Sequence, residues 1–277
     1  MTSYPFADRT AEYDRLIAQG GIFDPLTRRL LQAAGLAPGM RVLDIGSGAG
    51  NVARLVAEIV GPAGAVVGID ADPAAVELAS QNNSSPNIEF RVADLRSLDG
   101  IEGGFDAVTG RLVLMYLADP VGALRQAASR VRPGGLVCMH EGDLAYLWAS
   151  PQTPLWDQAR AWLLEALEKA GIETRMGLAL YSLYAEAGLP RPQLLHEATM
   201  GGGPGNPGWG WGNVVSAAVP LMEKLGVATR AEVDPATLSD RLVAETLATG
   251  GCVICPPMTG AWAVRPASQD QGSDSSA

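Results

Sequence analysis

The stretch that most constrains this chain is residues 42–51, which read VLDIGSGAGN. An apolar run breaks into three alternate glycines, Gly46, Gly48 and Gly50, and an apolar pattern then resumes as far as Val60. Glycine is favoured where a backbone turns with positive φ or approaches a ligand closely, and the N–H groups of a following helix point into such a turn. The stretch therefore predicts a strand, a tight turn and a helix around a nucleotide-like ligand.

The spacing of these glycines disfavours a dinucleotide site. Such sites use G-x-G-x-x-G, whereas the position that the third glycine would take after Gly48 is Asn51 here. Asp44 lies at the end of the predicted strand, where a carboxylate repels phosphate and suits a cationic ligand. A βα turn without any ligand remains the alternative.

Two further acids follow the next two predicted strands. Residues 65–70 form a β-rich run that ends in Asp70, and residues 87–92 alternate in polarity and lead to Asp94. The carboxyl ends of parallel strands meet at one edge of a sheet, so both acids are expected beside the glycine turn. An acid at the position of Asp70 accepts hydrogen bonds from ribose hydroxyls. Asp94 as a solvated loop residue is the alternative.

This ordered set of motifs resembles the class I S-adenosylmethionine-dependent methyltransferases. Residues 42–51 are similar to motif I of that family, and the turn at 132–135, Arg-Pro-Gly-Gly, is similar to another family element. The resemblance covers residues 40–143 and implies a set of cofactor-binding residues at the sheet edge. They are Asp44, Gly46, Ser47, Gly48, Gly50, Asp70, Ala71, Asp94, Leu95 and Arg111.

The resemblance implies distinct roles within that set. In the family, an acid after the third strand takes the amino group of adenine and the next backbone N–H meets the ring, which matches Asp94 and Leu95. The loop after the fourth strand lies over the methionyl part in relatives, and here it begins with Arg111. The guanidinium of Arg111 matches the methionine carboxylate well, or it pairs structurally with Asp44 or Asp106.

The fold implied is α/β, with a doubly wound, seven-stranded, mostly parallel sheet of the Rossmann-like methyltransferase type. We expect strand six at 193–198 and strand seven at 252–255 or 259–264. Relatives join these strands by a short hairpin, whereas helical patterns fill the interval here and predict a helical cap insertion. The predicted division is an N-terminal helical segment covering the site (1–36), a methyltransferase core (37–200 and 251–265), the cap (201–250) and a disordered tail (266–277).

Candidate groups for the chemistry follow the fifth predicted strand. Methyl transfer from a sulfonium requires alignment, and a base is needed only if the acceptor must lose a proton of high pKa. His140 and Glu141 are the candidate catalytic residues, although His140 can equally be a satisfied buried histidine. Aromatic side chains are the candidates for substrate binding, with core packing as the alternative for each. They are Tyr13, Tyr116, Trp148, Trp209 and Trp211.

Charge and cysteine content restrict the partners. The net charge of -10 and the pI of about 4.7 argue against nonspecific binding of nucleic acid or acidic lipid. The three cysteines, Cys138, Cys252 and Cys255, predict no disulfide framework, and with no leader pattern we expect a cytoplasmic protein. Cys252 and Cys255 have no second pair or nearby histidine, so a buried structural role is expected and no metal is predicted. No apolar run is long enough to span a membrane.

The sequence therefore predicts a methyltransferase that uses S-adenosylmethionine to methylate a small metabolite at oxygen, nitrogen or carbon. An alternative is an S-adenosylmethionine-binding protein or a non-methylating enzyme on the same fold. A nicotinamide-dependent oxidoreductase shares the terminal acid Asp70 but is disfavoured by the glycine spacing. The acceptor and the choice between a monomer and a homodimer stay open.

Overall fold

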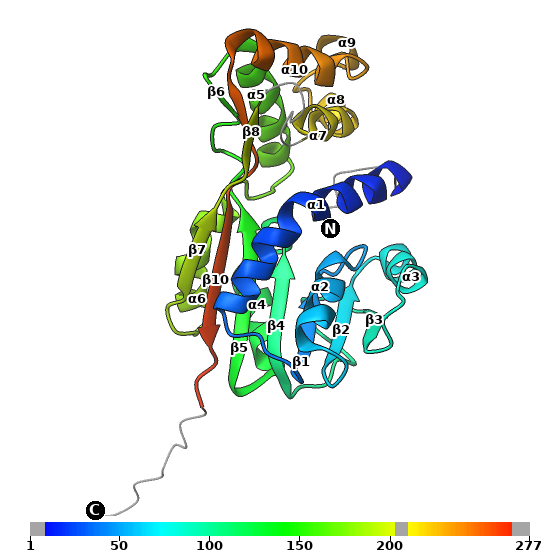
Figure 1. Cartoon of the computed structure of the whole chain (residues 1–277), viewed down its shortest axis with the longest axis vertical. Coiled ribbons are helices and arrows are strands. Elements are labelled where there is room, and N and C mark those ends of the chain that lie inside the picture. The colour runs from blue at the N-terminus through cyan, green and yellow to red at the C-terminus, as the bar shows by residue number, and fades with distance from the viewer. Residues whose placement is uncertain (1–8, 203–209, 268–277) are drawn as a thin grey trace, which may run out of the picture.

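The computed structural model describes residues 9–202 and 210–267 (Figure 1). Within them the main sheet has seven strands in the order β3-β2-β1-β4-β5-β10-β7. β10 is antiparallel to both of its neighbours, and the other pairs are parallel. The strands are β1 (Arg41–Ile45), β2 (Ala65–Asp70), β3 (Ile88–Val92), β4 (Phe105–Arg111), β5 (Val131–Gly142), β7 (Gln193–Glu197) and β10 (Met258–Val264). The predicted fold class is confirmed, and 258–264 provides the last strand.

Helices cover both faces of this sheet, which is why β1 and β2 are apolar almost throughout. α1 and α2 pack together over one face, while α4 and α6 pack beside β5 on the other. α1 crosses the carboxyl edge of the sheet diagonally in Figure 1. These helices are α1 (Arg9–Ala33), α2 (Asn51–Val60), α3 (Pro73–Gln81), α4 (Pro120–Ser129) and α6 (Met176–Glu186), with a short 3₁₀ helix, η1 (Leu114–Tyr116).

A second body lies beyond the carboxyl edge, at the top of Figure 1. It contains a short antiparallel sheet in the order β6-β9-β8, formed by β6 (Ala149–Ser150), β8 (Met200–Gly202) and β9 (Cys252–Ile254). Its helices are α5 (Pro154–Lys169), α7 (Trp211–Ala217), α8 (Val219–Lys224), α9 (Arg230–Val233) and α10 (Leu238–Thr249). Because α5 packs on α7, α8 and α10, the segment 201–250 shares its core with residues that precede it in sequence.

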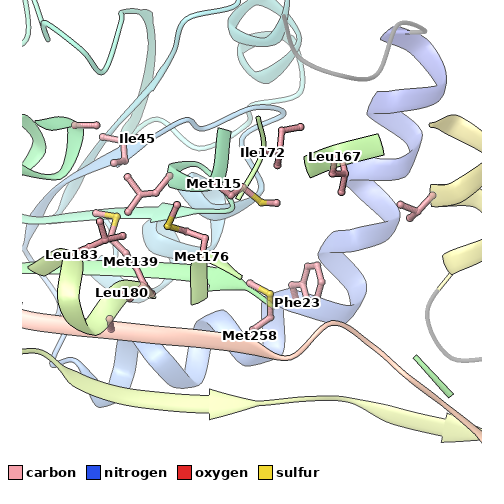
Figure 2. Close-up of a cluster of buried hydrophobic side chains, with 14 of the residues drawn as sticks. Phe23, Ile45, Met115, Met139, Leu167, Ile172, Met176, Leu180, Leu183 and Met258 are labelled. Carbon is pink, nitrogen blue, oxygen red and sulfur yellow. The ribbon is translucent and has the colours of Figure 1, made fainter. Parts of the chain in front are cut away.

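The two bodies are joined by a buried apolar cluster rich in methionine. Figure 2 shows Met115, Met139, Met176 and Met258 gathered with Phe23 of α1 and with leucine and isoleucine side chains. Methionine is unbranched and flexible, so it fills the irregular space where elements of different orientation meet. The cluster places η1, β5 and α1 in fixed relation at the carboxyl edge.

In the described part of the chain, no helix is long and apolar enough to cross a membrane.

Candidate functional site

The glycine turn has the backbone that its sequence predicts. Gly46, Gly48 and Gly50 all have positive φ, of 62°, 50° and 81°. Gly50 also precedes α2 as its N-cap, with no side chain to cap the helix. The turn is held by the Ser47 N–H, which donates to the Ile69 carbonyl at 2.8 Å. Residues 46–50 thus form a tight connection whose geometry only glycines adopt readily.

Asp70 braces this turn from the end of β2. Its Oδ2 accepts the Gly48 N–H and its Oδ1 accepts the Asp72 N–H, each at 2.9 Å. Burial raises the pKa of Asp70, and these backbone hydrogen bonds lower it. The predicted juxtaposition of Asp70 with the glycines is therefore present. Its carboxylate shapes the turn as well as facing the site.

Asp44 is the most unusual residue at this edge. It is almost fully buried, and neither carboxylate oxygen has a hydrogen-bond partner among the described residues, nor does the hydroxyl of Ser47. Burial raises the pKa of Asp44 to about 8, while the charge of Arg111 opposes that rise. Leaving such groups unpaired is costly, so a buried acid and hydroxyl beside a glycine turn fit a cationic ligand with hydrogen-bond donors.

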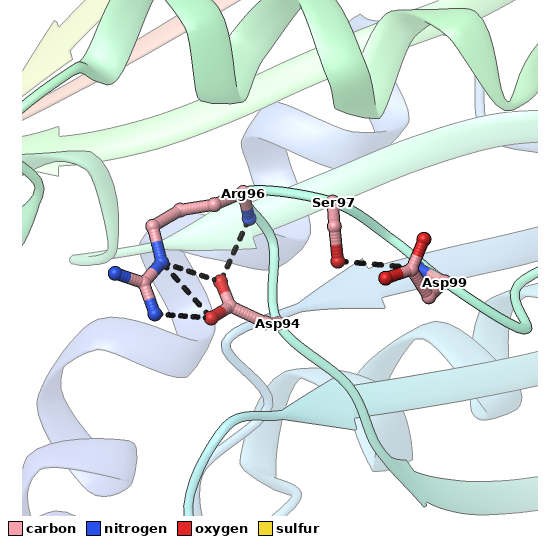
Figure 3. A network of polar contacts seen from close by, with 4 residues as sticks. All are labelled: Asp94, Arg96, Ser97 and Asp99. Atoms are coloured by element: carbon pink, nitrogen blue, oxygen red, sulfur yellow. Dashed lines mark hydrogen bonds and ion pairs between the residues drawn. The ribbon is translucent and has the colours of Figure 1, made fainter.

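Asp94 lies after β3, and its carboxylate is engaged. Figure 3 shows Arg96 binding it through the guanidinium and the backbone N–H, with the latter 2.8 Å from Oδ1. This pairing lowers the pKa of Asp94. The site is exposed, so the pair is weakly held. An adenine amino group would therefore share the carboxylate with Arg96 or displace it.

A polar row lies beneath α1 on one face of the sheet. Arg111, at the end of β4, donates from Nη1 to Asp24 Oδ1 at 2.8 Å and to Thr27 Oγ1 at 2.9 Å. Thr27 Oγ1 also lies 3.1 Å from His140 Nδ1. The structural partner of Arg111 is thus Asp24, and not Asp44 or Asp106 as the sequence suggested. Asp106 instead binds Arg132 at 2.7 Å.

The tautomer of His140 follows from its neighbours. The Thr27 hydroxyl has a single proton, which it gives to the Phe23 carbonyl at 2.9 Å within α1. His140 Nδ1 must then be the donor to Thr27, which leaves Nε2 as an acceptor. Burial lowers the pKa of His140 to about 3, and the charge of Arg111 adds to this effect. The imidazole is therefore neutral.

His140 and Glu141 lie on opposite faces of β5, because successive side chains alternate along a strand. His140 contacts Thr27 of α1. Glu141 is fully buried on the other face, where Oε1 accepts the N–H groups of Val113 and Leu114. Burial raises the pKa of Glu141 to about 7. The two candidate catalytic groups therefore cannot act on one atom as a pair.

The aromatic candidates fall in different places. Trp148 and Trp211 stack with ring centroids 3.6 Å apart and planes 8° apart, and both are buried in the second body. Tyr116 is half-buried in η1. Tyr13 lies in the part of α1 whose side chains are outside the described residues, and Trp209 lies outside them altogether. The stacked tryptophans are core residues of the second body in this structure.

Among the described residues, the cysteines form no cluster with other potential metal ligands. None of the three forms a disulfide, and Cys138 and Cys255 are buried. Across residues 9–202 and 210–267 there is no group of three His, Cys, Asp or Glu side chains that could hold a metal ion.

Sequence reasoning missed three residues of this site. Asp24 and Thr27 reach Arg111 and His140 from α1, and Val113 lies against Gly46, where an added Cβ would be 2.4 Å from its Cγ2. No local pattern marks an acid, a threonine or a valine for these contacts. The signal was only a coarse one: Asp24 and Thr27 lie in the segment predicted to cover the site, and Val113 lies in the loop after the fourth strand, which the resemblance places over the methionyl part of the cofactor.

Comparison with known proteins gives one family. The family described as "Methyltransferase domain" matches residues 36–187. Aklanonic acid methyltransferase DauC of Streptomyces sp. (strain C5) is 36% identical over 135 residues, 48% of this chain and 60% of that protein. The ubiquinone/menaquinone biosynthesis C-methyltransferase UbiE of Ectopseudomonas mendocina (strain ymp) is 30% identical over 156 residues, 54% of this chain and 59% of that protein. The chain thus spans less than two thirds of the length of these relatives.

Among solved structures, a putative methyltransferase from Bacillus halodurans C-125 (BH2331) has a similar fold. The TM-score is 0.54 at 16% identity, over 86% of this chain and 98% of that one. The likeness at this identity concerns the fold alone.

Proposed function

Because the chain belongs to the methyltransferase-domain family, we propose that it transfers a methyl group from S-adenosylmethionine to a small metabolite. S-adenosylmethionine is the cofactor of this family, and when bound it supplies a methyl group on an activated sulfonium. The observation that carries the proposal is the buried, unpartnered carboxylate of Asp44 beside the glycine turn. A cation placed there would favour the ionised form of Asp44 and supply the partner that its carboxyl group lacks in the free protein.

The residues at the sheet edge suit the parts of this cofactor. Asp44 and Ser47 would hold its positively charged end, and Asp70 would accept the ribose hydroxyls. Asp94 and the Leu95 N–H would hold adenine. Arg111 would take the carboxylate while it remains within reach of Asp24. These residues come in turn from the carboxyl ends of β1, β2, β3 and β4.

The acceptor would bind near the end of β5, where the neighbouring side chains are apolar. A Cβ added to Gly142 would lie 3.3 Å from Leu112 Cδ2, 3.6 Å from Met258 Sδ and 3.9 Å from Leu144 Cδ2, so apolar side chains converge on the end of β5. The neutral His140 offers an acceptor nitrogen and no charge. Together they support a small apolar or aromatic acceptor, methylated at oxygen, nitrogen or carbon.

The chemical work of the protein is then chiefly alignment and exclusion of water. A buried imidazole whose pKa is about 3 binds a proton poorly in the free enzyme. It can still orient an acceptor hydroxyl or amine through Nε2. We therefore assign to His140 the orientation of the acceptor, with proton removal required only for acceptors of high pKa.

Calorimetry with S-adenosylmethionine and S-adenosylhomocysteine tests the proposal first. We expect both to bind, and NADH fluorescence not to change on titration. Incubation with methyl-labelled cofactor and a panel of phenols, quinols, carboxylic acids and amines then tests transfer. Binding without label in any product would favour the alternative of a binding protein or a non-methylating enzyme. Absence of binding would refute the proposal.

Cys138, Cys252 and Cys255 form no disulfide, which supports a reducing compartment, so a cytoplasmic location is part of the same proposal.

A further inference from the structure

Glu141 has an arrangement that differs from that of a proton-transfer group. Its side chain is fully buried in β5, and Oε1 accepts two backbone N–H groups, from Val113 and Leu114, each at 2.9 Å. Oε2 is buried with no hydrogen-bond partner among the described residues. One oxygen of the carboxylate therefore anchors the loop that follows β4.

That loop needs an anchor because its backbone is strained at one point. Leu112 completes the ladder to β5 through its N–H, which donates to the His140 carbonyl at 2.9 Å. Its φ is 54°, in the left-handed region that non-glycine residues rarely adopt. Such strain persists only where surrounding contacts hold the conformation. The two hydrogen bonds to Glu141 come directly after this turn and hold the chain in its new direction.

The held segment contacts the glycine turn directly. An added Cβ on Gly46 would be 2.4 Å from Cγ2 and 3.0 Å from Cγ1 of Val113, so the valine side chain closes over the first glycine. The same segment is held from the other side, because the Met115 carbonyl accepts the Glu173 N–H at 3.0 Å. A shift of Val113 would therefore change the shape of the turn at residues 46–50.

We propose that Glu141 is a positioning residue, which fixes Val113 against Gly46 and so sets the shape of the glycine turn at residues 46–50. The inference rests on the proposed function in taking this turn to bind S-adenosylmethionine. It gives Glu141 a task other than the proton transfer that its place in the sequence suggested. Glu141 acts from the face of β5 opposite to His140.

Three variants test this role. Glu141→Gln keeps a carbonyl oxygen that can accept both N–H groups, Glu141→Leu keeps the volume without an acceptor, and Val113→Ala removes the contact with Gly46. We expect S-adenosylhomocysteine affinity to stay within threefold in Glu141→Gln and to fall at least tenfold in Glu141→Leu and Val113→Ala. The double variant Glu141→Leu/Val113→Ala should be little weaker than Glu141→Leu, because both act through one contact.

Steady-state kinetics separate positioning from proton transfer. A positioning role predicts that Glu141→Leu raises the KM for the cofactor while Glu141→Gln keeps kcat. A loss of kcat in Glu141→Gln as large as in Glu141→Leu would overturn the proposal. So would an unchanged affinity in Val113→Ala, which is a mild substitution and is expected to fold.

Amide exchange, followed by NMR in the protein without cofactor, keeps the test independent of the proposed function. The amides of Val113 and Leu114 should stay protected in Glu141→Gln and lose protection in Glu141→Leu. Should the wild type bind no S-adenosylhomocysteine, the proposed function fails and this exchange pattern still decides whether Glu141 anchors the loop. Equal protection in both variants would refute the anchor.

Discussion

Arg111 and Asp24 form an ion pair of 2.8 Å between the end of β4 and the middle of α1, although 87 residues separate them in sequence. The guanidinium is nearly buried, with 8% of the side chain exposed, while Asp24 is 36% exposed. The pair fixes α1 over the polar row that contains Thr27 and His140. The helix that is predicted to cover the site is thus bound to the same arginine that is expected to hold the cofactor carboxylate.

Replacing Asp24 with alanine should loosen α1. The nearly buried guanidinium would lose a charged hydrogen bond, which typically stabilises by about 1.5–3 kcal/mol. We expect the free energy of unfolding in urea to fall by about 1.5 kcal/mol, the lower end, because Asp24 is half-exposed. Cofactor affinity should change in the same experiment, since Arg111 would be released from its partner.

The ion pair between Arg28 of α1 and Glu58 of α2 provides a matched control. Both of its side chains are exposed. Exposed pairs contribute about 0–1 kcal/mol, so Glu58→Ala should scarcely change the free energy of unfolding. Equal losses in Asp24→Ala and Glu58→Ala would contradict a special role for the buried arginine.

Cofactor binding should release a proton from Asp44. Its pKa is raised to about 8 by burial, so the carboxyl is mostly protonated at pH 7 in the free protein. A cation placed beside it favours the ionised form and lowers the pKa. Calorimetric titration at pH 7 in buffers of different ionisation enthalpy should report close to one proton released. Asp44→Asn should abolish the release, whereas Asp106→Asn, at the far end of β4, should leave it unchanged.

Asp70 should contribute to cofactor binding in two ways. It accepts the Gly48 N–H that shapes the turn, and it is expected to accept the ribose hydroxyls. Asp70→Ala should therefore weaken S-adenosylmethionine binding by about 1.5–3 kcal/mol, the usual contribution of hydrogen bonds to a charged group. Asp72→Ala removes the cap of α3 without touching the turn and serves as the control in the same calorimetric assay. Unchanged affinity in Asp70→Ala would show that the ribose binds elsewhere.

The part of this site that could be predicted is the part set by strand ends. Asp44 and Asp70 lie at the carboxyl ends of β1 and β2, and the three glycines come directly after β1. Parallel strands bring their carboxyl ends together whatever the rest of the chain does. The neighbours of those residues could not be predicted in this way. Asp24 reaches Arg111 only through the packing of α1 across the sheet, and no spacing in the sequence encodes a contact over that interval.

The short strands of the second body could not be predicted from the sequence either. Residues 252–255 were an expected alternative for the seventh strand, whereas residues 252–254 pair with Ala149–Ser150 and Met200–Gly202 in a separate sheet. Strands of two or three residues are too short for polarity to alternate detectably. Their pairing depends on the packing of α5 against α7 and α10, which only the folded chain displays.

Protonation of Glu141 should appear in the pH dependence of stability. Its pKa is raised by burial from 4.5 to about 7 in the folded state, so the folded protein keeps this proton while the unfolded chain loses it. The free energy of unfolding should therefore fall as pH rises from about 4.5 to about 7, by at most about 3 kcal/mol from this group. Asp44 contributes in the same direction and His140 in the opposite one. The difference between wild type and Glu141→Gln isolates Glu141, and parallel pH profiles would contradict its raised pKa.

The stack of Trp148 on Trp211 should be essential to the second body. Trp148 lies in the segment after β5, Trp211 begins α7, and the indole of Trp211 also donates to the Ile254 carbonyl of β9 at 3.0 Å. Removing such a buried ring costs about 3–5 kcal/mol, so Trp211→Ala should lower the unfolding free energy by that amount and Trp148→Ala by a similar one. Because the rings contact each other, the double variant should lose about 0.5–1.5 kcal/mol less than the sum of the singles.

Near-ultraviolet circular dichroism should lose the signal of the coupled indoles in either single variant, while Trp162→Ala, at a half-buried position on α5, should retain it. Additive losses would mean that the two tryptophans stabilise separate parts of the molecule.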